Sequence, residues 1–154
     1  MKCPRCKEPE TKVIDSRTIE DGFSIRRRRE CSVCGYRFTT YEKMELDIVV
    51  IKKDGRREPY DRNKLLSGLK KAIHKRPVSE EVIRNFVKEL ELDLIQKGEI
   101  EVPSSYIGEK VMSALKEWDK VAYIRFASVY RDFKDPFEFV EQVEGLKREK
   151  GETD

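Results

Sequence analysis

Cys3-Pro4-Arg5-Cys6 and Cys31-Ser32-Val33-Cys34 are two CxxC pairs that hold all four cysteines of this 154-residue chain. Each CxxC turn aims two thiolates at one point, and two such turns close a tetrahedron around one metal ion. Four sulfur ligands leave no open position for water or substrate. The spacing therefore predicts one structural Zn²⁺ ion without a catalytic role. The alternative, two disulfides, suits a reducing compartment less well. The predicted ligands are Cys3, Cys6, Cys31 and Cys34.

The residues around the cysteines predict a small sheet. Strand-like runs lie at 11–16, 24–30 and 36–41, and Glu20-Asp21-Gly22 supplies a hairpin turn between the first two. This segment has too few large aliphatic side chains to fold alone, and metal binding supplies the missing free energy. We therefore expect residues 1–46 to form a zinc ribbon with a three-stranded antiparallel sheet.

Residues 47–140 are expected to form a second, mostly helical domain. The runs at 48–51 and 57–60 flank Asp54-Gly55 and predict a short β-hairpin. The apolar period then changes to 3.6, which predicts helices. A short strand is expected at 99–102, and residues 141–154 are expected to hold a helix end and a tail that frays from 147. The overall fold class is α+β. The predicted helix caps are Asp61, Ser79, Ser104 or Ser105, Asp119 and Asp135.

Composition limits the partners of the chain. Charged residues make up 41% of it, but the formal net charge is only +3, so the protein as a whole is not a polycation. It has no secretory signal and no long apolar run, so we expect a cytoplasmic protein without a membrane partner. Any argument for nucleic-acid binding must therefore rest on a local patch of charge.

That local patch is a run of four arginines between the two cysteine pairs. Strand alternation places Arg26 and Arg28 on one face and Arg27 and Arg29 on the other. Guanidinium groups suit phosphates and guanine edges, whereas the simpler alternative is a solvated face. A single-strand binder would carry more aromatic residues for stacking, which favours double-stranded DNA. The predicted DNA contacts are Lys12, Arg17, Arg26, Arg27, Arg28, Arg29 and Arg37.

A second basic cluster surrounds the predicted hairpin. Lys52 and Lys53 end a strand, and Lys64 lies in the first turn of the next helix, so three ammonium groups could meet a triphosphate with help from the helix N-terminus. Glu58 could accept a hydrogen bond from a base or ribose. The segment has no P-loop motif, and lysines beside a turn are often mere surface residues. The single histidine, His74, is expected to be a partly exposed helix residue and not a ligand.

Longer motifs narrow these alternatives. The cysteine pairs occur with Val13-Ile14-Asp15-Ser16-Arg17, Arg26-Arg27-Arg28-Arg29-Glu30-Cys31 and Arg37-Phe38-Thr39-Thr40-Tyr41-Glu42. A late run reads Val121-Ala122-Tyr123-Ile124-Arg125-Phe126-Ala127-Ser128-Val129-Tyr130-Arg131. Over about residues 1–140 the chain resembles the bacterial NrdR family of transcriptional repressors of ribonucleotide reductase genes. The lysine segment is similar to the ATP-cone of that family, although Lys52-Lys53-Asp54-Gly55 replaces the usual Lys-Arg-Asp-Gly.

The resemblance implies a non-enzymatic repressor. Its zinc ribbon would bind operator DNA of ribonucleotide reductase genes, and the protein would associate with the nucleoid when bound. ATP or dATP in the cone would set the homo-oligomeric state and thereby the affinity for DNA, with dATP as the co-repressor. Tyr130 and Arg131 would close the pocket. The implied nucleotide contacts are Lys52, Lys53, Glu58, Tyr60 and Lys64.

Two other functions deserve comparison. A reductase subunit could carry the same cone, but all the cysteines are committed to metal and no nucleophile-base pair is visible. A zinc-ribbon accessory protein of the transcription or translation machinery would explain the first third of the chain and leave the cone without a role.

Overall fold

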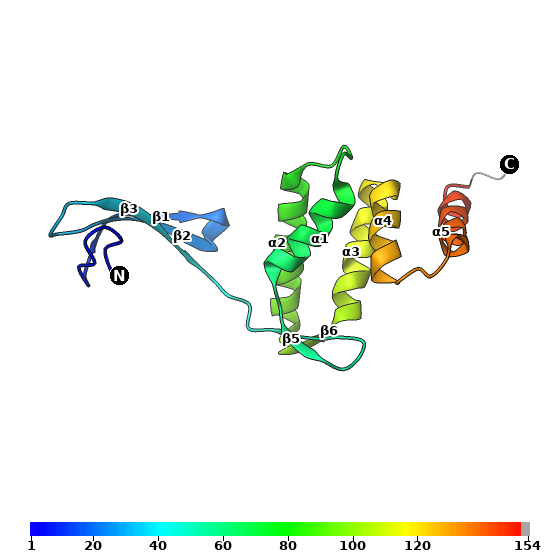
Figure 1. Cartoon of the computed structure of the whole chain (residues 1–154), viewed down its shortest axis with the longest axis horizontal. Coiled ribbons are helices and arrows are strands. Elements are labelled where there is room, and N and C mark those ends of the chain that lie inside the picture. Colours follow the sequence, from blue (N-terminus) through cyan, green and yellow to red (C-terminus); the bar gives the residue numbers. More distant parts are fainter. Residues whose placement is uncertain (152–154) are drawn as a thin grey trace. The chain divides into compact units, whose positions relative to one another are not determined.

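The computed structural model describes residues 1–151 and divides the chain into two compact units, Met1–Glu45 and Leu46–Asp154 (Figure 1). Each unit has its own architecture: a small sheet beside the cysteines in the first, and a helical bundle on a second small sheet in the other. In the described part of the chain no helix is long and apolar enough to cross a bilayer.

The first unit confirms the predicted three-stranded antiparallel sheet, with strand order β1-β2-β3. β1 continues to Ile19, beyond the predicted end at residue 16. A single 3₁₀ turn, η1, then joins it to β2. A register shift between Val13 and Asp15 adds one residue to β1 opposite β2. The strands are β1 (Lys12–Ile19), β2 (Ser24–Glu30) and β3 (Arg37–Lys43), and η1 is Glu20–Gly22.

The second unit contains a mixed sheet in which the predicted hairpin forms one half. β4 (Val49–Ile51) pairs antiparallel with β5 (Arg57–Pro59) and parallel with β6 (Glu101–Pro103), in the order β5-β4-β6. The sequence predicted the late strand but not its pairing with β4. The pairing places the fully buried Val102 beside Val50, so two strands far apart in the chain close one apolar layer.

Five helices complete this unit, and four begin with the side-chain caps that the sequence predicts. Asp61, Ser79, Asp119 and Asp135 each accept a backbone N–H from the first turn that follows. Gly98 ends α2 with φ near 69°, a conformation that costs glycine little. The helices are α1 (Arg62–Ile73), α2 (Glu80–Lys97), α3 (Ser104–Trp118), α4 (Lys120–Tyr130) and α5 (Pro136–Glu149).

Two expectations about helix ends are wrong. Neither Ser104 nor Ser105 caps α3, because β6 runs directly into the helix and the N-cap is Pro103, which has no side-chain cap. Fraying does not begin at residue 147, because α5 continues to Glu149 with Lys147 and Arg148 in its last turn, where basic side chains favour the helix dipole. The last three residues of the expected tail, 152–154, lie outside the described residues.

Two apolar clusters hold the helical unit together. The larger cluster contains buried side chains from all five helices. Examples are Leu69, Ile83, Val111, Leu115 and Leu146, all with at most 9% exposure. The smaller cluster packs α2 against the sheet through Ile48, Leu90, Leu94 and Val102. The two clusters share Leu65, Phe86 and Ile107 at their margins. The sheet is thereby fixed to the bundle, and the β4–β5 hairpin has a defined position beside α1 and α3.

Candidate functional sites

The four cysteines converge as their spacing predicts. All four Sγ atoms lie within 4.8 Å of one another, with Cys3 and Cys34 at 3.7 Å and Cys6 and Cys31 at 3.5 Å. A regular tetrahedron with Zn–S bonds of about 2.3 Å separates its sulfurs by about 3.8 Å, so these positions suit a single zinc ion. Cys3 and Cys31 are buried, which makes the site part of the small core of this unit.

Each cysteine pair is held by the same backbone turn. The N–H of Lys7 donates to the carbonyl of Cys3, and the N–H of Gly35 donates to the carbonyl of Cys31, both at 3.0 Å. Lys7 and Gly35 both follow the second cysteine of a pair, and their φ values are 67° and 69°. A backbone hydrogen bond from Cys6 lowers the pKa of Cys3. Against a backbone hydrogen bond from Glu8, burial and the other three thiols raise the pKa of Cys6, so Cys3 ionises before Cys6.

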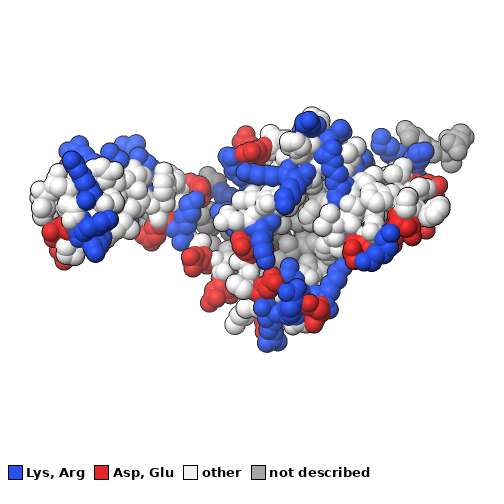
Figure 2. Space-filling view, in the orientation of Figure 1, with Lys and Arg blue, Asp and Glu red and all other residues white. Residues whose placement is uncertain are grey.

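The sheet presents basic side chains on two faces. Residues opposite each other in neighbouring strands point to the same face, and Arg17 pairs with Arg26, which in turn pairs with Tyr41. The same face, named here the Arg26 face, holds five of the seven predicted DNA contacts: Lys12, Arg17, Arg26, Arg28 and Arg37. Arg27 and Arg29 lie on the opposite face, as alternation predicts. Figure 2 shows Lys and Arg side chains along the upper rim of this unit and on the side turned to the viewer.

Carboxylates neutralise some of these cations but not all. Glu30 pairs with Lys12 at 3.4 Å and Arg37 at 2.6 Å, which lowers the pKa of Glu30. Arg17 pairs with Asp15, and Arg27 with Glu42. The remaining three guanidinium groups have no carboxylate partner among the side chains that the structure describes. Among them, Arg28 and Arg29 donate only to threonine hydroxyls of β3, which orients them without removing their charge. The three are Arg26, Arg28 and Arg29.

A cavity of about 230 Å³ lies between the β4–β5 hairpin, α1, α3 and α4. Four of the five predicted nucleotide contacts line it, together with Tyr130 and apolar side chains from three helices. The hairpin and the first turn of α1 thus bring polar groups to one rim of a largely apolar hollow, the usual design of a small-molecule site. These four are Lys52, Glu58, Tyr60 and Lys64.

Glu58 organises the charges at this rim. Its carboxylate lies 3.3 Å from Nζ of Lys64 and 3.8 Å from Nζ of Lys52. The hydrogen bond from Lys64, with the charges of Lys64, Lys52 and Arg56, lowers the pKa of Glu58. The two ammonium groups are therefore held at the cavity by one carboxylate, which a more highly charged phosphate chain can outcompete.

Three side chains are placed differently from the expectation. Tyr60 turns its hydroxyl to Glu91 at 3.0 Å, so it offers the cavity its ring, and burial with the charge of Glu91 raises its pKa. Lys53 does not line the cavity; its ammonium lies 4.9 Å from the centre of the Tyr130 ring. Arg131 donates to Gln142 of α5 and does not line the cavity either.

The helix N-terminus contributes less than predicted. The N–H groups of Asn63 and Lys64 already donate to the carboxylate of Asp61, so those two backbone donors of α1 are taken. The positive charge that this end of α1 offers to a ligand is therefore that of the Lys64 side chain, and not the partial charge of these backbone N–H groups.

Sequence reasoning missed the residue that makes room for Tyr130. A Cβ at Gly108 of α3 would lie only 2.2 Å from the Tyr130 ring, so only glycine permits this contact. The ring also stacks on Phe126, with centres 5.9 Å apart. An isolated glycine within a helical pattern, one residue after Ile107 and three before Val111, was the available signal of close packing.

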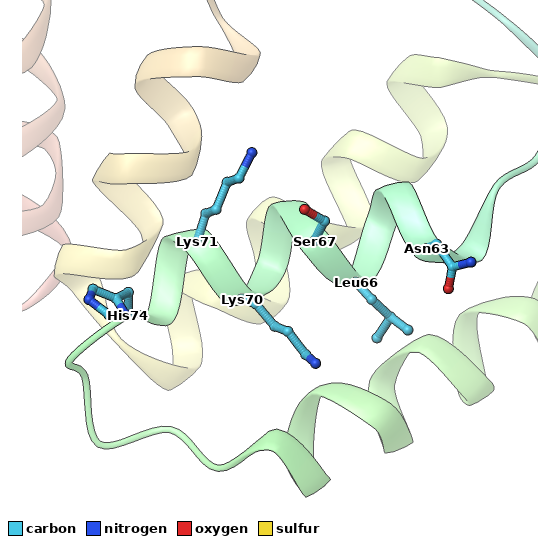
Figure 3. A pocket seen from close by; sticks show the side chains of 6 residues that line it. All are labelled: Asn63, Leu66, Ser67, Lys70, Lys71 and His74. Atoms are coloured by element: carbon cyan, nitrogen blue, oxygen red, sulfur yellow. The ribbon is translucent and has the colours of Figure 1, made fainter.

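Another hollow on the described surface lies elsewhere. It has a volume of about 610 Å³, and its lining residues are five from α1 and His74, which directly follows that helix. Figure 3 shows Lys70 and Lys71 pointing away from each other along this helix, and the exposed His74 at its end. A hollow along one helix with diverging cations does not gather groups around a ligand. The lining residues are Asn63, Leu66, Ser67, Lys70, Lys71 and His74.

Comparison with known proteins assigns both units. Residues 1–42 match the family described as "Transcriptional repressor NrdR-like, N-terminal domain", and residues 48–136 match the ATP cone domain. The chain belongs to the NrdR family. It is 54% identical over 147 residues to the transcriptional repressor NrdR of Geotalea uraniireducens, covering 95% of this chain and 98% of that protein. It is 55% identical over 151 residues to NrdR of Desulforamulus reducens, covering 97% and 96%.

Membership confirms the resemblance seen in the sequence. NrdR proteins are regulators and not enzymes, which agrees with a metal site whose four sulfur ligands leave no catalytic position. The zinc ribbon supplies the metal-binding cysteines, and the ATP cone indicates a nucleotide ligand.

Proposed function

We propose that this protein represses ribonucleotide reductase genes by binding their operators as a homo-oligomer, and that ATP and dATP control this assembly. It acts in the cytoplasm, on the nucleoid. Residues 1–46 bind double-stranded DNA, and residues 47–140 bind the nucleotide. The observation that carries the proposal is the joining of an arginine-bearing zinc ribbon and a lysine-rimmed cavity in one chain that belongs to a repressor family.

The DNA contact is assigned first to the Arg26 face. It combines two guanidinium groups that lack carboxylate partners, Arg26 and Arg28, with the exposed ring of Tyr41. Lys12, Arg17 and Arg37 flank them and can exchange their carboxylate partners for phosphates. Arg27 and Arg29 lie behind the sheet and contact DNA only where it wraps around the edge.

The nucleotide is assigned to the 230 Å³ cavity. Lys52 and Lys64 bind the phosphates, and Lys53 contributes charge from beside Tyr130. Glu58 and the ring of Tyr60 contact the ribose or base. One zinc ribbon offers few phosphate contacts, so DNA affinity depends on ribbons held together at a fixed spacing. A nucleotide that favours one assembly over another thus changes DNA affinity without touching DNA.

A band-shift experiment tests the proposal. The full chain is mixed with promoter DNA of a ribonucleotide reductase gene, and ATP or dATP is added in turn. We expect dATP to increase retardation relative to ATP, with a parallel change in mass by light scattering. Equal retardation with and without either nucleotide would overturn the proposal.

The same assay separates the two faces of the sheet. The double variant Arg26→Ala/Arg28→Ala should weaken binding about uniformly and reduce the salt slope by about 0.9 for each lost phosphate contact. Arg27→Ala/Arg29→Ala is the matched control with the same change in charge on the opposite face. A larger loss in the control would move the contact to that face, and unchanged zinc content in both variants shows that the metal site is intact.

A further inference from the structure

α5 carries apolar side chains on its outer side as well as on its packed side. The packed side meets α4, where Gln142 accepts from Tyr123 and Arg131, and Leu146 is buried. At 100° per residue, Val140 lies about 160° around the helix from Gln142. The outer stripe therefore runs through Phe137, Val140 and Val143.

This stripe is exposed to an unusual degree. Phe137 is 76% exposed, Val140 50% and Val143 39%. A surface helix normally turns its apolar residues to one side, and a helix that is apolar on two sides is buried on both. Figure 1 shows α5 at the margin of the helical unit, beyond α4. The apolar side chains of the outer stripe are thus exposed in the described structure, although a stripe of this composition is normally buried against a partner.

The charges along the helix indicate which partner covers it. The first part carries Asp135, Glu138 and Glu141 without a basic residue. At the end, Lys147, Arg148 and Lys150 outnumber the two acids Glu144 and Glu149, so that end has a net positive charge. An identical helix in antiparallel orientation brings each acidic half beside a basic end, and it also opposes the helix dipoles favourably. A parallel orientation would place like charges together.

We infer that α5 pairs with α5 of a second copy of this chain, in antiparallel orientation through Phe137, Val140 and Val143. Val140 packs beside Val143 of the second copy, and Phe137 meets the alkyl stem and ammonium group of Lys147 of the second copy. This pairing deepens the proposed function and rests on it, because it names one surface of the nucleotide-controlled assembly.

The size of the surface makes the pairing weak when isolated. A helix of 14 residues is about 21 Å long and about 10 Å wide, so its face is much smaller than the roughly 800 Å² per partner of a stable complex. The pairing is therefore concentration-dependent by itself and becomes effective where another contact in the assembly already brings two copies together.

Val140→Glu tests the inference in the full chain. The substitution is at an exposed position, and circular dichroism checks that the fold is kept. Light scattering over a concentration series, with no nucleotide, ATP or dATP, should show at least a tenfold weaker self-association. Val121→Glu is the matched control, an exposed valine of α4 that is 41% accessible. It should assemble as the unsubstituted chain does.

Cross-linking tests the orientation. With Val140 opposite Val143, the two copies of Val140 are offset by about 4.5 Å along the axis, and the two copies of Phe137 by about 13.5 Å. A short bifunctional thiol reagent should therefore join Val140→Cys but not Phe137→Cys. The zinc-loaded unsubstituted chain shows the background from the native cysteines. Equal cross-linking at both positions would overturn the antiparallel pairing.

The outcomes separate this inference from the proposed function. If Val140→Glu assembles as well as the unsubstituted chain and still responds to dATP, the α5 pairing is wrong and the proposed repressor mechanism stands. If the unsubstituted chain stays monomeric with every nucleotide while calorimetry shows that it binds them, both the pairing and the proposed assembly switch fail.

Discussion

At the scale of single residues, the charge balance around Glu58 matters most. Lys64 and Lys52 both lie within 4 Å of its carboxylate, and neither is deeply buried. Exposed ion pairs of this kind stabilise a fold little. Their arrangement at the rim of a cavity is better explained by readiness to bind an anion than by stability.

Lys64→Ala should weaken nucleotide binding. A charge-assisted hydrogen bond contributes about 1.5–3 kcal/mol, so we expect the affinity for ATP and dATP to fall by about tenfold or more, measured by calorimetry. Lys70→Ala, on the same helix but outside the cavity, is the control and should bind normally. Normal binding by Lys64→Ala would remove this residue from the site.

At the scale of elements, the contact between α3 and α4 shapes the cavity. The ring of Tyr130 occupies the space that a side chain at position 108 would fill, and its hydroxyl lies 3.5 Å from the carbonyl of Ser105. The cavity wall thus depends on how closely two helices approach each other.

Gly108→Ala should displace Tyr130 and lower the free energy of unfolding by about 1–3 kcal/mol, as overpacking does. Denaturant unfolding measures the loss, and calorimetry should show altered nucleotide binding. Gly145→Ala is the matched control, because a Cβ there meets nothing within 4 Å and should stabilise α5 by about 0.5–1 kcal/mol. Gly108→Ala with unchanged stability would mean that α3 and α4 separate easily.

A second link between elements is the ion pair of Asp119 with Arg76. Asp119 accepts from the N–H of Ala122 as the cap of α4, and its carboxylate lies 2.8 Å from Arg76, which follows α1. Its side chain is only 8% exposed. The hydrogen bond from Arg76 is the main cause that lowers the pKa of Asp119, although burial opposes it.

This pair should make stability depend on pH at the acid end. Because the pKa of Asp119 is lowered in the folded state, its stabilisation is present above the ordinary value of about 3.8 and is lost as the pH falls through the folded value. Asp119→Asn keeps a capping side chain and removes the titration. Thermal unfolding between pH 7 and 2 should therefore show a smaller acid loss in this variant than in the unsubstituted chain. Equal losses would assign the pH dependence to other groups.

At the scale of the whole molecule, the two units depend on different sources of stability. The helical unit has two apolar clusters, whereas the buried apolar side chains of the first unit, among the described residues, are those of Cys3 and Cys31. We therefore expect the first unit, but not the second, to need a metal ion in order to fold.

Removal of zinc by a chelator should unfold the first unit alone. We expect DNA binding to be lost, while the helical circular dichroism signal and nucleotide affinity stay near their original values. Re-addition of zinc should restore DNA binding. Loss of the helical signal on chelation would show that the second unit depends on the first.

Local chemistry determined much of this protein from the sequence alone. The CxxC spacing predicted the metal site, alternation along β2 predicted the two faces of arginines, and Asp61, Ser79, Asp119 and Asp135 predicted four helix starts, because each signal acts within a few residues. Only the tertiary structure decided what depends on contacts between distant segments. These are the pairing of β4 with β6, the Gly108–Tyr130 contact, the turning of Tyr60 to Glu91, and the exposed outer stripe of α5. A residue's own sequence neighbours do not specify which distant surface it meets.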